Sequence, residues 1–565
     1  MRKKIRGGRM LSFILAASLA LSAPLSVAAA GTEEIDVSGY IGQTKEDVSE
    51  TGDTQGDTAS VETGSSDTDA ATGGTGYIPI DDGFVPQHAE DAADMTEGEL
   101  SVDRAAALPA VFDGSERVTF DFYDQGETNT CWAYAALEAC RINADMKGLK
   151  GKQTDLSADE YAYYFFNKGV DVSDLQGNET GDYARQETGL GYLNAGGNGR
   201  LGMWQLASWM GPVADAGSSD HLGNTQAVYG NDVLHVQNVL MANTADIDNV
   251  KDLIYTYGGV SVGYYAETGR DAIASYDSFA NGKEYDDGHS KNYGNYYCPD
   301  EKAANHNVLL IGWDDNYKKE NFVQTPSSDG AWLVLNSWGG ESDQVAQNGM
   351  FWLSYEDAGL TGSKVGLAFD VEDSDNYQHN YQYDGSFGIQ TASNVSKAVQ
   401  LFKLGSDEAV KAFSVGVEDA NVSYKAEIFK LSESVDTFDE SWVKPLFDDG
   451  QSITCDGKNV TASCIASTAG TFSYGGYHTV KLSQPTTGLK AGTVVAVVLT
   501  FDAPAKVFTD TTCTVSNYWG FTTAKTDAFK GYGKQQSTEY GSMADHETLR
   551  IKMFTDDKAA DEDTE

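Results

Sequence analysis

The chain has 565 residues, of which 85 are Asp or Glu and 39 are Lys or Arg, so its formal net charge is −46. A field of this sign repels nucleic acid and anionic membrane, and we expect neither as a partner. The six cysteines are sparse and form no CxxC pair, which argues against a disulfide-built scaffold and a structural zinc site. We therefore expect no metal and no cofactor.

The amino terminus has the three parts of a secretory signal peptide. Basic residues precede Met10, an apolar run extends to about Leu21, and small residues follow up to Ala30. The apolar run is too short to span a bilayer, and no later stretch is long enough. We expect residues 1–30 to be removed, and the mature protein to be secreted or cell-surface, with no membrane insertion.

Residues 31–105 are rich in Gly, Ser, Thr, Asp and Glu and contain few aromatic residues. Such a segment buries too little apolar surface to offset its ordering entropy, so most of it is predicted to be disordered. It is either a spacer or a pro-segment that is removed on maturation. Its last part, from Tyr77 to Leu100, carries the apolar residues that would allow it to dock on the folded body.

From about Ala107 onwards the chain alternates between regular elements and turns. The patterns predict helices near 131–147, 156–167, 198–213 and 246–257, then strands near 259–267, 305–316, 330–339 and 349–357. In the second helix Ser157 is the expected N-cap, with Glu160 at the capping-box position. Helices followed by strands predict an α+β fold.

Beyond Phe369 the pattern changes to short alternating strands at turn spacing, which predicts an antiparallel β-sandwich. We assign residues 369–380 to a linker, residues 381–555 to the sandwich and residues 556–565 to an acidic tail. Cys455 and Cys464 flank a turn-rich segment and are either bridged or free.

The stretch QGETNTCWAYAALEACR, from Gln125 to Arg141, predicts a reactive cysteine. Cys131 stands at the first position of the predicted helix, where the helix dipole lowers the pKa of a thiol and favours the nucleophilic thiolate. Gln125 lies upstream across a tight turn, and its side-chain amide can donate to an oxyanion. The alternative is that Cys131 only fills the core.

A cysteine nucleophile needs a histidine that pairs with the thiolate and later protonates the leaving amine. His306 is the best placed, because it opens the apolar strand HNVLLIGW. Asn336, in Asn336-Ser337-Trp338-Gly339, closes the next strand, AWLVL, and its amide oxygen can orient the imidazole. Trp338 can shield that hydrogen bond from water.

These motifs, in this order, resemble the papain family of cysteine peptidases over residues 106–368. The resemblance implies that Cys131 is the nucleophile, His306 the general acid/base and Asn336 its orienter, with Gln125 in the oxyanion hole. It also implies a two-lobed fold with a cleft between a helical and a β-rich lobe. The family hydrolyses peptide bonds through a thioester acyl-enzyme, so the expected substrate is a protein or peptide.

The chain departs from the family pattern at two places. Thr128 stands where the family has a second cysteine, so the usual disulfide is missing, and Asp314 to Gly330 lengthens the connection between the histidine and asparagine strands. Gly196 and Gly197 fall where the family has a glycine-rich cleft wall. We assign them to substrate binding together with Trp338.

Exported bacterial relatives often carry a second domain described as lectin-like, and residues from about Tyr381 to Phe554 look similar to it. A glycan or cell-surface ligand follows only from that label. Two other functions stay open: a surface adhesin built on a peptidase-derived scaffold, and a cell-wall peptide hydrolase. A scaffold has no need for all four candidate catalytic residues, and the NSWG element and the Cys131-Trp132 pair favour the papain type.

Overall fold

The structure is a computed structural model. It describes residues 76–77, 84–89, 108–118, 123–149, 156–167, 192–214, 232–267, 276–277, 294–300, 302–339, 349–383, 390–431, 446, 452–455, 458–510, 533–537 and 548–557. The predicted signal peptide, most of residues 31–105 and most of the acidic tail lie outside the described residues. Among the residues that are described, no helix is long and apolar enough to cross a membrane.

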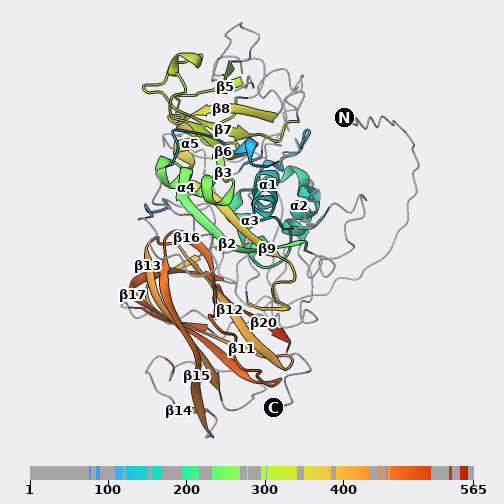
Figure 1. The fold of residues 1–565 in the computed structure, drawn as a ribbon, viewed down its shortest axis with the longest axis vertical. Helices are drawn as coiled ribbons and strands as arrows, with labels where there is room; N and C mark the ends of the chain where they lie inside the picture. The colour runs from blue at the N-terminus through green and yellow to red at the C-terminus, as the bar shows by residue number, and fades with distance from the viewer. Residues whose placement is uncertain are drawn as a thin grey trace, which may run out of the picture. The chain divides into compact units, whose positions relative to one another are not determined.

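The first region, residues 108–373, contains all five named α-helices of the described chain (Figure 1). They are α1 (Cys131–Met146), α2 (Ala158–Asn167), α3 (Gly199–Ala207), α4 (Ile247–Tyr257) and α5 (Ala358–Ser363). The strands are β1 (Val111–Asp113), β2 (Leu234–Asn243), β3 (Val260–Tyr264), β4 (Tyr276–Asp277), β5 (Gly294–Tyr296), β6 (His306–Asp314), β7 (Ala331–Leu335), β8 (Met350–Ser354) and β9 (Val365–Asp373). The four predicted helices and four predicted strands of this region are present, although α3 ends at Ala207 and does not extend to residue 213.

Local capping explains where two of the helices begin and end. The Glu160 N–H donates to Ser157 Oγ at 3.1 Å, so Ser157 caps α2 as predicted. The Ser157 N–H donates to the Val213 carbonyl instead of to Glu160, so only half of the predicted capping box forms. Helix α4 ends at Gly258, whose φ of 97° and close approach to Ile142 both require glycine.

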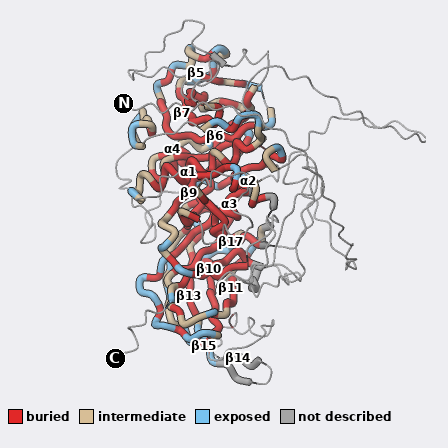
Figure 2. Tube along the Cα trace, turned by 90° about the vertical axis from the view of Figure 1, so that its right-hand side faces the viewer, coloured by how far each residue is buried: buried red, intermediate tan, exposed pale blue. Residues whose placement is uncertain are grey.

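The strands of the first region form a sheet against which α1 packs. β6 pairs antiparallel with β3 on one side and with β7 on the other, and β7 pairs antiparallel with β8. Helix α1 packs against β6 and β9, and Trp132, Ile142 and Leu309 belong to one hydrophobic cluster. Figure 2 shows these elements as mainly buried. The result is a rigid frame around the first turn of α1.

The second region, residues 379–557, consists of antiparallel strands. They are β10 (His379–Tyr381), β11 (Gln390–Lys403), β12 (Glu408–Val417), β13 (Val422–Leu431), β14 (Ser452–Cys455), β15 (Lys458–Phe472), β16 (Gly475–Lys481), β17 (Val494–Asp510), β18 (Gly533–Ser537), β19 (Thr548–Leu549) and β20 (Ile551–Asp557). The residues predicted as a linker, 369–380, instead include the end of β9 and the start of β10. Cys464 carries an exposed free thiol, so it is not bridged.

The two regions share a strand pairing and a hydrophobic core. β16 pairs antiparallel with β2, and Gly476 lies opposite Leu240 with a φ of 135°. A Cβ on Gly476 would lie 1.7 Å from the Val239 carbonyl oxygen, so the pairing requires glycine there. Trp204 of α3 packs edge-on against Tyr477 and Phe508, with ring centroids 5.3 and 5.1 Å away.

Strand β2 is absent from the sequence prediction, and its residue pattern explains why. Nine of its ten residues are buried, because β9 covers one edge and β16 part of the other. Leu234 to Gln237 alternate, but the register shifts between Val236 and Asn238 and an apolar run follows from Val239 to Ala242, so no single alternation of polar and apolar residues spans the strand.

Candidate active site

Cys131 is the first residue of α1, and its side chain is fully buried. Thr130 precedes the helix and makes no side-chain capping hydrogen bond, and the Ala133 N–H donates to the Thr130 carbonyl at 2.9 Å. The Asn307 N–H, from β6, donates to Cys131 Sγ at 3.4 Å. The start of α1 and the start of β6 are therefore in direct contact at the sulfur.

His306 and Asn336 lie together at one end of the β6–β7 pair. His306 Nε2 is 2.8 Å from Asn336 Oδ1, and the register of Leu309 with Leu335 brings the two residues together. The imidazole stacks on Trp338 with ring centroids 4.5 Å apart. His306 is fully buried, and its Nδ1 has no hydrogen-bond partner. One ring nitrogen is thus held by Asn336, while the other is free to exchange a proton.

Burial controls the protonation of both groups in this structure. It lowers the pKa of His306 to about 4, against a smaller upward effect of the Asn336 hydrogen bond. It raises the pKa of Cys131 to about 12, although backbone N–H groups, including that of Asn307, favour the thiolate. The sequence predicted a thiolate stabilised by the helix dipole. In this covered state desolvation acts against that effect and favours the neutral thiol of Cys131.

Gln125 is buried and fixed beside the start of α1. Its Nε2 donates to the Thr128 carbonyl at 2.7 Å, and its Oε1 accepts from Ser337 Oγ at 2.6 Å. The backbone N–H of Gln125 donates to the Ser337 carbonyl at 2.8 Å. A side-chain amide carries two N–H donors, and the bond to Thr128 uses one of them. The other can serve an oxyanion.

A piece of residues 31–105 lies in the cleft. The Gly197 N–H donates to the Gly76 carbonyl at 2.9 Å, and the Tyr77 N–H donates to the Asn305 carbonyl at 2.9 Å. Tyr77 is buried in a small cluster with Cys131 and Ala304. Gly76 and Tyr77 therefore run between the glycine wall and the residue before His306, and they cover the sulfur.

The glycine wall itself is tightly packed. A Cβ on Gly197 would lie 2.6 Å from the Trp132 indole, and Gly196 has a φ of 73°. Both positions thus require glycine, and Gly197 offers its N–H to an extended chain, as Gly76 illustrates. Trp338, the third residue assigned to substrate binding, stacks on the imidazole of His306.

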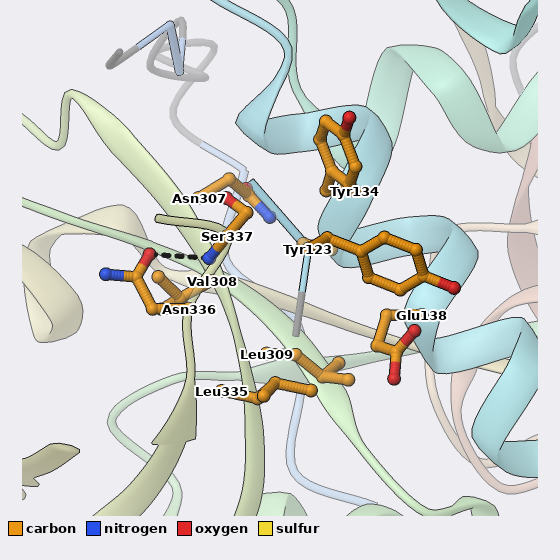
Figure 3. Close-up of a pocket in the computed structure, with 10 residues that line it drawn as sticks. Tyr123, Tyr134, Glu138, Asn307, Val308, Leu309, Leu335, Asn336 and Ser337 are labelled. Atoms are coloured by element: carbon orange, nitrogen blue, oxygen red, sulfur yellow. Dashed lines mark hydrogen bonds between the residues drawn. The ribbon is translucent and has the colours of Figure 1, made fainter. Parts of the chain in front are cut away.

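Behind the cleft is a small cavity of about 20 Å³, enough for one water molecule (Figure 3). Tyr134 and Glu138 enter it from α1, whereas Leu309 and Leu335 enter it from the strands. Glu138 forms a buried ion pair with Arg141. Asn307, Asn336 and Ser337 also line the cavity, so it belongs to the site already described.

The other described histidine of the first region does not join this site. His235, on β2, is buried between Asp232 and Asn376, with its ring stacked on Trp209 at 3.6 Å. His221 and His289 lie outside the described residues.

Solved structures show a similar arrangement of the whole chain. The cysteine protease and lectin-like domains of Cwp84, a surface layer associated protein of Clostridium difficile, match with a TM-score of 0.57 and 20% identity, over 86% of this chain and 93% of that one. The chain has the fold of a cysteine protease joined to a lectin-like domain. Clostridial Cwp84 after propeptide cleavage matches with a TM-score of 0.55 and 20% identity, over 79% of this chain and 99% of that one.

A more distant match is digestive procathepsin L2 from the Tenebrio molitor larval midgut, with a TM-score of 0.32 and 16% identity over 50% of this chain and 78% of that one. No protein-family model matches the chain, and no curated protein matches it in sequence. The structural likeness therefore carries the fold, while the chemistry has to be argued from the residues of this chain.

Sequence reasoning missed three contributors to the cysteine protease fold's cleft. Ser337 holds the Gln125 amide, Asn307 contacts the sulfur, and Tyr77 covers it. Ser337 and Asn307 follow Asn336 and His306 directly in the sequence, and this adjacency was an available signal. Tyr77 had no such signal, because it lies in a segment whose composition predicts disorder.

Proposed function

We propose that the chain is the latent precursor of an exported cysteine endopeptidase, with Cys131, His306 and Asn336 as its triad. One observation carries the proposal. His306 has Nε2 on Asn336 Oδ1 at 2.8 Å and an unpartnered Nδ1, beside a cysteine at the first position of a helix. Buried His379 and His478 of the second region also leave one ring nitrogen without a partner, so it is the combination with Asn336 and the helix-terminal cysteine that sets His306 apart.

The reaction has two steps, and the first transfers the acyl group of the substrate to Cys131. When a peptide replaces Gly76 and Tyr77, His306 Nδ1 takes the proton of Cys131 and the sulfur attacks the scissile carbonyl carbon. The backbone N–H of Cys131 and the free N–H of Gln125 stabilise the oxyanion. The C–N bond breaks, and the imidazolium returns the proton to the leaving amine.

The second step releases the acyl group. The thioester left on Cys131 is attacked by a water molecule whose proton goes to His306, the C–S bond breaks, and the thiol is restored as the carboxylic acid departs. Asn336 keeps the imidazole in the orientation that both steps need. Gly197 would bind the substrate backbone by the contact that Gly76 now occupies, in the manner of strand addition.

We infer a latent precursor because Gly76 and Tyr77 occupy the cleft. A substrate carbonyl cannot reach Cys131 while Tyr77 is buried against it, so release of residues 31–105 must precede catalysis. The predicted signal peptide and the surface layer association of the similar Cwp84 support action outside the cell. Protein or peptide is the proposed substrate.

A peptide-library cleavage profile of the matured chain, set beside the same chain with Cys131→Ala, tests the proposal. We expect cleavage that vanishes in the variant and an irreversible adduct of a peptidyl epoxide on Cys131 by mass spectrometry. Equal turnover in the variant would end the assignment. Purified cell wall as a second substrate distinguishes a wall hydrolase, and glycan binding by the Cys131→Ala chain tests the lectin-like role proposed for the second region.

A further inference from the structure

A second short segment upstream of the first region, Phe84–Ala89, contacts both regions at once. His88 Nδ1 pairs with Asp246 Oδ2 at the N-cap of α4. The Ala89 N–H donates to Asn249 Oδ1 at 2.8 Å, and Asn249 Nδ2 donates back to the Ala89 carbonyl at 3.2 Å. Ala89 is buried, so the end of this segment is anchored on the first region.

The same segment is held from the other side by the turn between β12 and β13 of the second region. Asn421 Nδ2 donates to the His88 carbonyl at 2.8 Å, and Gln87 Nε2 donates to Asp419 Oδ1 at 3.1 Å. The turn is itself braced, because the Lys506 N–H donates to Asp419 Oδ2 at 2.8 Å. The second region thus presents a prearranged carboxylate and amide to residues 87 and 88.

We propose that the second region is part of the device that keeps the precursor latent, because its β12–β13 turn and the start of α4 form a joint docking surface for residues 87–89. We call this surface the clasp: Asp246, Asn249, Asp419 and Asn421. Its occupant is the segment Gln87 to Ala89 of this chain, which offers its backbone, the Gln87 amide and the His88 imidazole as hydrogen-bonding groups.

The physical reason is the linkage of two weak contacts. The cleft holds Gly76 and Tyr77 through backbone hydrogen bonds, and the clasp holds Gln87 to Ala89 a short stretch of chain later. Once one segment is bound, the other rebinds at the high effective concentration set by the short connection. Loss of the second region's two hydrogen bonds would therefore increase exposure of the cleft, although neither bond touches it.

The proposal rests on the proposed function for its consequence, but its contacts can be tested without activity. The test is amide hydrogen exchange of residues 76–89 in the full-length Cys131→Ala chain, with and without Asn421→Gly. Asn421 has a φ of 58°, which glycine tolerates, so the change removes little more than the amide. Asn394→Gly is the matched control, since Asn394 is an exposed asparagine of the second region with a φ of 56°.

We expect exchange in residues 76–89 to rise roughly fivefold in Asn421→Gly and in Gln87→Ala, the factor typical of one lost hydrogen bond. It should not change in Asn394→Gly. Asn249→Ala, which removes both bonds to Ala89, shows that the measurement detects release of the segment. Unchanged exchange in Asn421→Gly and Gln87→Ala, with a rise in Asn249→Ala, would overturn the role of the second region.

The active chain provides the second readout. Asn421→Gly should shorten the lag before peptide cleavage begins and leave the final rate per molecule as in the wild type. Faster exchange in Asn421→Gly, together with a wild-type chain that cleaves no peptide, would retain the clasp and reject the peptidase. Normal cleavage with an unchanged lag and unchanged exchange would retain the peptidase and reject the clasp.

Discussion

Gln125 and Thr128 hold each other through reciprocal hydrogen bonds. Gln125 Nε2 donates to the Thr128 carbonyl at 2.7 Å, and Thr128 donates to the Gln125 carbonyl from its Oγ1 at 2.7 Å and from its backbone N–H at 3.3 Å. Thr128 occupies the position where the papain family has a disulfide cysteine. In this chain hydrogen bonds between Gln125 and Thr128 therefore hold the proposed oxyanion donor, Gln125, at a place where the papain family has a disulfide.

Thr128→Val should loosen this turn while keeping the shape of the side chain. The hydroxyl bonds to the Gln125 carbonyl and to the Thr130 hydroxyl disappear, each of which costs about 1 kcal/mol, and we expect kcat to fall roughly fivefold to tenfold. Steady-state kinetics on a fluorogenic peptide measures the change. Thr128→Ser retains the hydroxyl and should keep kcat near the wild-type value; an equal loss in both variants would assign the effect to packing.

Gln125→Ala should remove the oxyanion donor itself. We expect kcat to fall about 100- to 1,000-fold with little change in KM, because the interaction is made to the charge of the transition state. Ser337→Ala removes only the hydroxyl that holds Gln125 Oε1, so its loss should be about tenfold. A Gln125→Ala enzyme with unchanged kcat would exclude this residue from the oxyanion hole.

Tyr77→Ala should expose the sulfur in the uncleaved chain. Burial raises the pKa of Cys131 to about 12, so at pH 7 its thiolate fraction is on the order of 10⁻⁵. Opening the cover returns solvent to the thiol, lowers its pKa and should increase its alkylation by iodoacetamide at least tenfold. Mass spectrometry of each site gives the rates, and the exposed Cys464 is the internal control. Identical Cys131 rates in both chains would show that Tyr77 does not shield the sulfur.

Acid should destabilise the fold through two buried histidines. Burial lowers the pKa values of His306 and His478 to about 4, whereas an unfolded chain has values near 6.5. Below pH 6.5 the two histidines are protonated in the unfolded state but remain neutral in the folded state. The free energy of unfolding therefore falls as the pH drops towards 4. Each histidine contributes a loss of about 3 kcal/mol.

Urea unfolding at pH 7 and at pH 4.5 measures this loss. His478 is remote from the proposed triad, on β16 and stacked on Phe472 at 4.5 Å, so His478→Gln isolates one of the two contributions. We expect the variant to lose clearly less stability than the wild type between the two pH values. The same loss in both chains would contradict a buried neutral His478.

The sequence identified the residues around the sulfur because each stands at the edge of a regular element. Cys131 begins a helix, His306 begins a strand and Asn336 follows one, and in each case the local pattern fixes the position of the side chain. The same reasoning did not predict the burial that raises the pKa of Cys131. Helix position is readable from sequence, whereas burial depends on Tyr77, which arrives from a distant segment.

The contacts between the two regions were equally hidden from sequence analysis. No single alternating pattern spans strand β2, and Gly476 reads as a turn glycine until its partner strand is known. Asn421 and Asp419 occupy a polar turn of the kind that is usually solvated. Their role as partners of His88 and Gln87 follows only from three-dimensional proximity.

The pairing of β2 with β16 also bears on aggregation. An unpaired strand edge presents free backbone donors and acceptors to any other extended chain, and the apolar run of β2 from Val239 to Met241 would be a hazardous edge. β16 caps that edge over Val239 to Met241 with a strand that needs glycine to approach. Even if the second region bound no ligand, it would cover β2 and so keep the first region from associating with other chains edge to edge.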